Sequence, residues 1–449
     1  MSRYYRNMRA CKKALKEPKL DNKENILLKK INDDSENKIE FDDKRSASDV
    51  PIKPFIPPPA SATLQEKKTN KTMLRDTYLN LRKEVFNHPS QKDWFVGKFN
   101  VSSDFRKFQI SNVNILEDGG IFQFSSDVEN ILSLHHIMLI DLTKMKKPNY
   151  VTTDERSWRS AIRQISQPDP PDFFGKILNE YEKTINDIDQ LRLLFYKMWG
   201  TYYEKVIYSD DERRIFETLQ IVSRSFFERM HMPTDSVRDD NEDTVMHEYI
   251  HDAFKETFRD ENYVIVWANS ISESSKDHRA TYGCSQGKKT DMTIYRIIEE
   301  GGREEICFIE AKPFSISRKS KIGGYNLYKV GIFCQGGLNN MISLHGTKFE
   351  SKTFGGHICE AYIYFFSMDL EYDGIYRFIQ LSEIKIAQGL HEFNLVRKLI
   401  METYFLKSRI DNYYSDRYGR SESPHRNDFV RQPAASPRAS GSNIPDVDL

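Results

Sequence analysis

Two acidic residues and a lysine within one short segment have the types and the spacing for metal-dependent chemistry. Residues 287–313 read GKKTDMTIYRIIEEGGREEICFIEAKP, and two β-like runs flank the pair Gly301-Gly302. A Gly-Gly pair between such runs predicts a two-residue hairpin turn, because both turn positions can adopt a positive φ. With these glycines at its centre, the hairpin places Asp291 opposite Lys312. Asp291, Glu310 and Lys312 then share one sheet face at one end of the hairpin.

These residue types suit the cleavage of phosphodiester bonds. Carboxylate oxygens bind hard divalent cations, so Asp291 and Glu310 are candidate ligands of Mg²⁺ or Mn²⁺. Such a metal polarises a phosphate and lowers the pKa of a bound water. Lys312 is the candidate catalytic cation, which orients that water or stabilises the charge developing on the phosphate. A salt-bridge cluster with no catalytic role is the alternative interpretation.

The surroundings of the pattern distinguish it from chance. Glu-x-Lys occurs six times in the chain, at residues 17, 36, 66, 310, 350 and 383. Only the pattern at Glu310 ends an apolar β-run, follows an Asp-led run across a turn and lies downstream of an acidic helix. We therefore assign the site to Glu310 and Lys312 alone among these matches.

A further carboxylate is predicted to face the same sheet. The spacing predicts a helix over residues 242–258, whose apolar stripe comprises Met246, Tyr249, Ile250, Ala253, Phe254 and Thr257. At ~100° per residue, Glu242 falls within this stripe at its N-terminal end. Glu242 is therefore a candidate supporting acid of the site. The alternative is that its charge only favours the helix dipole in the first turn.

The order of helix, strand and hairpin, with Asp291 followed by Glu310-Ala311-Lys312, resembles the PD-(D/E)XK, or restriction-endonuclease-like, nuclease superfamily. It also resembles uncharacterised fungal proteins that carry such a domain. The similarity covers about residues 240–385. It implies that Asp291 and Glu310 bind the metal, that Lys312 is the catalytic cation, and that Glu242 is the acid of the first helix. One departure is Thr290, which stands where the superfamily typically has proline.

The resemblance also implies the partner, which is nucleic acid, and DNA rather than RNA. Lys288 and Lys289 directly precede the motif and are candidate contacts to its phosphates; two solvated lysines are the alternative. In some members a polar residue of the following helix faces the metal site, and Lys329 and Gln335 are the candidates here. Since the superfamily contains many inactive members, a nuclease-fold module that binds nucleic acid or protein without cleaving it is the alternative function.

A competing pattern lies on the helix over residues 242–258. His247-Glu248-Tyr249-Ile250-His251 reads HExxH, in which two histidines one turn apart bind Zn²⁺ and the glutamate is the general base. No GxxH continuation follows, and no later helix offers a convincing third ligand. Asp252 adds a charge directly after the second histidine, and the histidines and Glu248 lie off the apolar stripe. A zinc peptidase is therefore the third candidate function.

The elements that must position the site lie in the C-terminal half of the chain. Helices alternate there with strands, which predicts an α/β domain with a mixed, restriction-endonuclease-like sheet flanked by helices. We place this domain at residues 242–412, after a polar linker at 233–241. The predicted helices are 242–258, 325–343 and 391–410, and the predicted strands are 262–268, 291–298, 305–312, 357–369 and 374–380.

Residues 73–232 predict a separate, mainly helical domain in which we find no chemistry. Strand-like runs at 94–99, 108–116 and 121–124 come first, and helical spacing follows from Val128 to Leu142. Capping boxes at Ser126–Glu129 and Ser209–Glu212 predict two helix starts, and a long helical stretch covers residues 173–207. The role of this domain stays open.

Composition limits the classes of protein that remain. The chain has 449 residues, with 66 Lys plus Arg and 66 Asp plus Glu, so its net charge makes no general case for nucleic-acid binding. Residues 1–72, basic and Pro-rich, and residues 413–449, rich in Arg, Ser and Pro, predict disordered tails. Five irregularly spaced cysteines predict a reducing compartment. Without an apolar leader or a stretch of ~20 apolar residues, we expect an intracellular protein of the nucleus or cytoplasm.

Overall fold

The computed structural model describes most of the chain from residue 90 onward. The described ranges are 90–163, 188–204, 209–230, 241–280, 287–298, 301–345, 351–417 and 426–431. All of them belong to one compact unit, residues 63–449. The predicted tail at 1–72, nearly all of the linker at 233–241 and most of the tail at 413–449 therefore lie outside the described residues.

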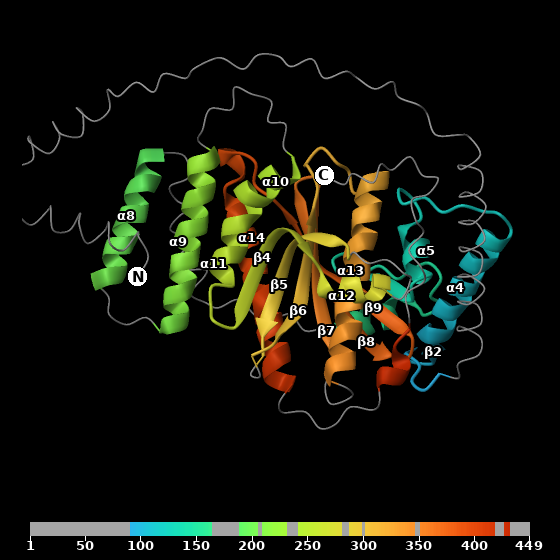
Figure 1. Cartoon of the computed structure of the whole chain (residues 1–449). Helices are drawn as coiled ribbons and strands as arrows, with labels where there is room; N and C mark the ends of the chain where they lie inside the picture. The colour runs from blue at the N-terminus through green and yellow to red at the C-terminus, as the bar shows by residue number, and fades with distance from the viewer. Residues whose placement is uncertain are drawn as a thin grey trace, which may run out of the picture. The chain divides into compact units, whose positions relative to one another are not determined.

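A seven-stranded mixed sheet forms the centre of this unit, with the strand order β3-β9-β8-β7-β6-β5-β4 (Figure 1). Its strands are β3 (Ile137–Asp141), β4 (Tyr263–Ile271), β5 (Lys289–Ile297), β6 (Arg303–Ala311), β7 (Lys352–Cys359), β8 (Tyr362–Tyr372) and β9 (Ile375–Lys385). The pairs β6–β7 and β3–β9 are parallel, and the other neighbours are antiparallel. The chain crosses from β6 to β7 through helix α13 (Lys321–His345), because parallel neighbours need such a crossover.

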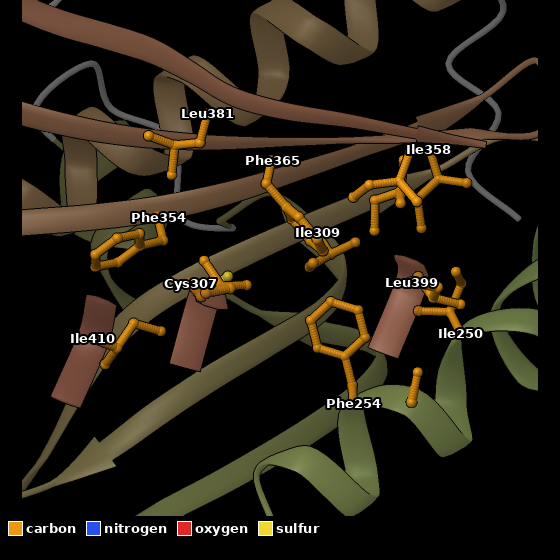
Figure 2. Close-up of a cluster of buried hydrophobic side chains, with 14 of the residues drawn as sticks. Ile250, Phe254, Cys307, Ile309, Phe354, Ile358, Phe365, Leu381, Leu399 and Ile410 are labelled. Carbon is orange, nitrogen blue, oxygen red and sulfur yellow. The ribbon is translucent and has the colours of Figure 1, made fainter. Parts of the chain in front are cut away.

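Helices cover both faces of the sheet. On one face, α13 and α5 (Val128–Ser133) pack on a core that includes Phe308 and Phe366. The other face is covered by α9 (Asp210–Met230), by α14 (Asn394–Arg417), and by a continuous helix made of α10 (Glu242–Val245), η1 (Met246–Ile250) and α11 (His251–Thr257). Figure 2 shows Phe254 of α11 and Leu399 of α14 among strand residues such as Ile309. Because both faces are covered, the central strands are buried along nearly their whole length.

The remaining elements lie around this three-layered centre. Strands β1 and β2 pair with each other as a short hairpin. These elements are β1 (Phe95–Val96), β2 (Phe99–Asn100), α4 (Val101–Glu117), α6 (Glu155–Arg163), α8 (Ile188–Glu204), α12 (Glu273–Ala280), η3 (Leu390–Glu392) and η4 (Arg426–Phe429). None of the helices in the described ranges is long and apolar enough to cross a membrane.

The predicted α/β class and mixed sheet are confirmed, but two elements of the C-terminal half differ: helix α12 was not predicted, and one predicted strand is two. The strand predicted at 357–369 is in fact two strands, β7 and β8. The chain reverses between them at Glu360 and Ala361, which have φ of 54° and 60°. Two successive residues with positive φ form a type I′ turn, and such turns usually carry Gly, Asn or Asp. This turn has none of them, so the sequence contains no local signal for it.

Several predictions for residues 73–232 were wrong. Residues 108–116 lie within helix α4, and residues 121–124 form no strand. The helix predicted through Leu142 ends at Ser133, after which His136 takes a φ of 62° and β3 begins. Short apolar runs fit a helix or a strand equally well, and here pairing with β9 decides. The sheet therefore includes a strand from the region that we assigned to a separate helical domain.

The predicted helix starts and the C-terminal boundary gave mixed results. The Ser209–Glu212 capping box is confirmed, since Glu212 N donates to Ser209 Oγ at 3.2 Å and Ser209 N donates to Glu212 Oε2 at 3.0 Å. The box at Ser126 is wrong, because α5 begins after Asp127 without a side-chain cap. Helix α14 continues to Arg417, and Phe429 is buried, so order extends beyond the boundary that we predicted at residue 412.

Close packing of α13 depends on a glycine in its first turn. A Cβ atom at Gly324 would lie 1.7 Å from the carbonyl oxygen of Phe124, in the segment that leads to α5. At Gly336 of the same helix, the nearest atom to such a Cβ would be 3.6 Å away, an ordinary contact.

We therefore expect Gly324→Ala to lower the free energy of unfolding by roughly 1–3 kcal/mol, because a backbone atom cannot move aside as a flexible side chain can. Gly336→Ala is the matched control, and its higher helix propensity should leave stability unchanged or raise it by up to about 1 kcal/mol. Urea unfolding of the two variants checks this. Equal effects at both positions would contradict the close approach.

Candidate active site

The hairpin of β5 and β6 brings Asp291 and Glu310 together. Met292 pairs with Ile309, and continuing this register places Asp291 opposite Glu310. The predicted register, with Asp291 opposite Lys312, is therefore wrong by two positions. An even shift keeps each side chain on its face, whereas a shift of one residue would have turned it to the other. For this reason Asp291 and Glu310 still lie on the same face of the sheet, as predicted.

Two local features cause the shift in register. Gly301 N donates to Ile298 O, and Ile298 N donates to Gly302 O, so the turn lies between Ile298 and Gly302 instead of being centred on the glycine pair. Gly301 takes a left-handed φ of 78°, which glycine adopts readily at the end of a hairpin turn. The turn alone shifts the pairing by three positions, as in the pair Ile297 and Arg303, and a bulge between Ile294 and Tyr295 takes one position back, which leaves the net shift of two.

Asp291 is anchored to the end of the neighbouring strand. Its Oδ2 accepts a hydrogen bond of 2.7 Å from the backbone N–H of Ala311, the residue between Glu310 and Lys312. Burial raises the pKa of the Asp291 carboxyl, and the charge of Glu242 adds to this; the Ala311 N–H and the cations of Lys329 and Lys312 oppose it. The carboxyl of Asp291 thus lies within the electrostatic reach of every other charged group of the site.

Glu310 is the most deeply buried member of the cluster. The residue is 0% exposed, and its Oε2 accepts from Lys329 Nζ at 2.8 Å. Its Oε1 is buried without a hydrogen-bond partner. Burial raises the pKa of this carboxyl to about 8, and the neighbouring charge of Asp291 contributes, while Lys329 opposes the rise. A buried oxygen without a partner, next to a second carboxylate, is an environment that a bound cation would stabilise.

Lys312 and Glu242 meet at the same sheet edge. Lys312 directly follows β6, and its Nζ donates to Glu242 Oε1. Glu242 is the first residue of α10, where the side chain of Asn241 caps the helix by accepting from Thr244 N at 2.8 Å. The predicted position of Glu242 at the end of the helix stripe agrees with this contact. The lysine side chain is 17% exposed, so it lies at the surface of the cluster and not in the core.

Lys329 belongs to the cluster; the sequence analysis named it, with Gln335, as a candidate to face the metal site and to contact nucleic acid. It comes from α13, in the layer over the sheet, and its side chain is 20% exposed. Burial opposes its charge, but the Glu310 carboxylate raises the pKa of the Lys329 ammonium above its ordinary value. Its partner could not have been inferred from helix periodicity, because that depends on how α13 crosses β6.

The other candidate contacts differ in how exposed they are. Gln335, further along α13, is fully buried and donates to the backbone oxygen of His135 at 2.9 Å. Lys288 Nζ lies 5.7 and 5.8 Å from the ring centroids of Tyr325 and Tyr328. Lys289 is exposed at the start of β5. Of these, Lys289 remains available for contact with a partner at the edge, and Gln335 does not.

A histidine that the sequence analysis did not single out lies beside the cluster. His357 of β7 pairs with Glu310 across the parallel β6–β7 ladder and is fully buried. Burial lowers the pKa of His357 to about 3, and the cations of Arg318 and Lys312 contribute. The ring is therefore neutral, and its Nε2 has no hydrogen-bond partner. No local sequence pattern predicts that His357 lies beside Glu310, because only the pairing of β6 with β7 brings the two residues together.

The HExxH histidines lie on the helix of Glu242 but form a different arrangement. Their ring centroids are 5.9 Å apart, and His251 packs on Trp267 at 4.6 Å. Among the described residues, no three His, Cys, Asp or Glu side chains are grouped closely enough to hold a metal. Zinc sites take three or four protein ligands. By contrast, Mg²⁺ is commonly held by one or two carboxylates together with phosphates of the substrate. The donor set of Asp291 and Glu310 fits the second pattern.

Comparison of the chain with protein-family models, curated proteins and solved structures found no match. The geometry of the described residues is therefore the basis on which a function can be assigned.

The raised pKa of Glu310 predicts how stability depends on pH without a metal. The folded protein holds a proton on Glu310 up to about pH 8, whereas an ordinary glutamate releases it near 4.5. The folded state binds this proton more tightly than the unfolded state does, so the bound proton stabilises the fold. This stabilisation is complete below pH 4.5 and is lost as the pH rises toward 8. One pKa unit corresponds to about 1.4 kcal/mol.

We expect wild type in EDTA to lose at least roughly 1 kcal/mol more unfolding free energy between pH 5 and 8 than Glu310→Gln does, since glutamine cannot titrate. Urea unfolding at several pH values in this window measures the difference. Parallel pH profiles of the two proteins would show that Glu310 titrates normally.

Proposed function

We propose that this protein is a metal-dependent nuclease that hydrolyses phosphodiester bonds of nucleic acid, DNA rather than RNA, with Mg²⁺ or Mn²⁺. The observation that carries the proposal is the environment of Glu310. Its carboxylate is fully buried with one oxygen unpartnered, it faces Asp291 across the hairpin, and Lys312 follows at the strand end. The mixed sheet with helices on both faces is compatible with a restriction-endonuclease-like fold, which is our proposal for its finer class.

Each residue has a chemical role in this proposal. Asp291 and Glu310 would hold the metal, which when bound would polarise the scissile phosphate and activate a water. Lys312 would stabilise the negative charge that develops on the phosphate, and its ion pair with Glu242 fixes the ammonium at the sheet edge. Lys329 favours the ionised form of Glu310, which is the form that binds a cation.

A second candidate is a nuclease-fold module that binds nucleic acid or protein without cleavage. The contacts favour it, because Glu310 is already paired with Lys329 and Lys312 is already paired with Glu242. In such a protein the cluster would be a closed salt-bridge network. The zinc peptidase lacks a comparable supporting observation, since no third ligand for His247 and His251 lies among the described residues.

Cleavage assays separate the two candidates. Labelled single- and double-stranded DNA and RNA are incubated with wild type in Mg²⁺, Mn²⁺ or EDTA. We expect metal-dependent cleavage of DNA, reduced at least about 10²-fold in Lys312→Ala, because a cation aimed at the developing charge is removed. The matched control is Lys385→Ala, which removes the lysine of another Glu-x-Lys pattern, paired with Glu392 at the end of β9.

Cleavage that persists in Lys312→Ala would rule out the proposed site. Nucleic-acid binding by wild type without any cleavage would favour the non-catalytic module.

Metal binding can be tested without any substrate. We expect millimolar Mn²⁺ to raise the melting temperature of wild type, because a ligand that binds only the folded state stabilises it by about 2.7 kcal/mol at a concentration 100 times its Kd. The shift should be larger at pH 8.5 than at pH 6, since metal binding must displace the proton that Glu310 holds up to about pH 8. Differential scanning calorimetry of wild type, Asp291→Asn and Glu310→Gln measures it. Equal shifts in all three proteins would show that the metal binds elsewhere.

A further inference from the structure

Cations gather on the loop that joins β6 to α13, next to the carboxylates. This loop, residues 312–320, begins with Lys312 and carries Arg318 and Lys319, and Lys321 follows at the first residue of α13. Lys319 and Lys321 are exposed and Arg318 is half-buried. Among the described residues, none of these three cations forms an ion pair with a carboxylate. They form a surface, the β6–α13 cationic loop, whose charge is not neutralised within the described fold.

Arg318 is held in a fixed orientation. Its guanidinium lies 4.0 Å from the ring centroid of Tyr364, and one nitrogen donates to Gln380 Oε1 at 2.8 Å. A planar guanidinium stacked on an aromatic ring keeps its other N–H donors together, and these match the oxygens of a phosphate. The side chain therefore loses little freedom when it binds an anion.

Backbone contacts hold the loop itself in place. Lys312 N donates to Ile358 O at 2.9 Å, and Glu360 N donates to Ile316 O at 3.2 Å, so the start and the middle of the loop are attached to the end of β7 and to the turn that follows it. Ser317 Oγ donates to the carboxylate of Glu360. Another acid in the vicinity, Glu383, pairs across β8 and β9 with Tyr364.

Strand pairing relates the loop to the carboxylates. Glu310 pairs with His357 across β6 and β7, and His357 pairs with Tyr364 across β7 and β8. Tyr364 thus lies two strand spacings from Glu310 on the same face, which is about 10 Å. Since nucleotides follow one another every ~3.4 Å along a helical strand, this distance corresponds to a few nucleotides. The exposed Lys289 lies two residues before Asp291, at the start of β5.

We propose that the β6–α13 cationic loop is the surface that binds the nucleic-acid backbone. Arg318 binds a phosphate that lies a few nucleotides from the phosphodiester bond cleaved at Asp291 and Glu310. The inference rests on the proposed function for the location of that bond. The binding itself does not require cleavage. The contacts are to phosphates, so affinity should vary little with base sequence and strongly with salt.

The test measures binding in EDTA, where no metal-dependent cleavage takes place. A fluorescein-labelled 30-nucleotide single strand and its duplex are titrated with wild type, Lys319→Ala/Lys321→Ala and Arg318→Ala by anisotropy at several salt concentrations. We expect each variant to bind about tenfold more weakly at low salt. The slope of log K against log salt should fall by about 1 for each phosphate that the variant no longer neutralises.

The control variant is Lys92→Ala/Arg303→Ala. Lys92 pairs with Glu371 near the end of β8, and Arg303 is the first residue of β6, so both cations lie at the opposite ends of the strands from the site. It should bind like wild type. Arg318→Ala also removes the stacking on Tyr364, so thermal unfolding accompanies it; the double lysine variant changes only exposed side chains. An unchanged salt slope in the lysine variant would overturn the proposal, as would a wild type that binds neither DNA form.

The two proposals fail in distinguishable ways. If wild type binds but does not cut with Mg²⁺ or Mn²⁺, and the loop variants weaken binding, the loop surface stands and the nuclease does not. If wild type cuts, and the loop variants neither weaken binding nor flatten the salt slope, the nuclease stands and the loop surface does not.

Discussion

The structure around the candidate site depends on one costly placement, the carboxyl of Glu310 in the interior of the sheet. A carboxylate removed from water costs several kcal/mol unless it is paired, or else it keeps its proton. Here one oxygen is paired with Lys329 and the other has no partner, while β7 and the helices on both faces exclude water. The raised pKa of the carboxyl expresses this cost. The other polar residues of the site lie around this buried group, and Lys329 lowers the cost of its burial by pairing with it.

The topology of the sheet brings the two lysines to the site. The parallel pair β6–β7 requires a crossover, and the crossover helix α13 lies over the face to which Glu310 points. This brings the Lys329 ammonium to the carboxylate. The same arrangement ends β6 at the edge where α10 begins, so Lys312 meets Glu242 there. A glycine in the first turn of α13 permits the close approach that this layer needs.

The two candidate functions differ in what neutralises Glu310. In a nuclease, a divalent cation held with Asp291 would share or replace the role of Lys329, and the proton would be released. In a binding module, the proton on Glu310 and the hydrogen bond from Lys329 would suffice. Both functions would use the same edge, where Lys289 and the β6–α13 cationic loop lie close in sequence to the carboxylates. A polyanion that lies along this edge would place its phosphates beside the cluster in either case.

The sequence alone determined the local features of this protein. Alternating and helical periodicity predicted the elements of the C-terminal half, and the face shared by Asp291 and Glu310 followed from strand parity, which survives a register shift of two. Tertiary structure decided the rest: β3 as a strand, the exact partner of Asp291, the pairing of Lys329 with Glu310, and the position of His357 beside it. The physical reason is that periodicity depends only on neighbours in the chain. Register, crossover and burial depend on contacts between segments far apart in sequence, and local patterns carry no record of those contacts.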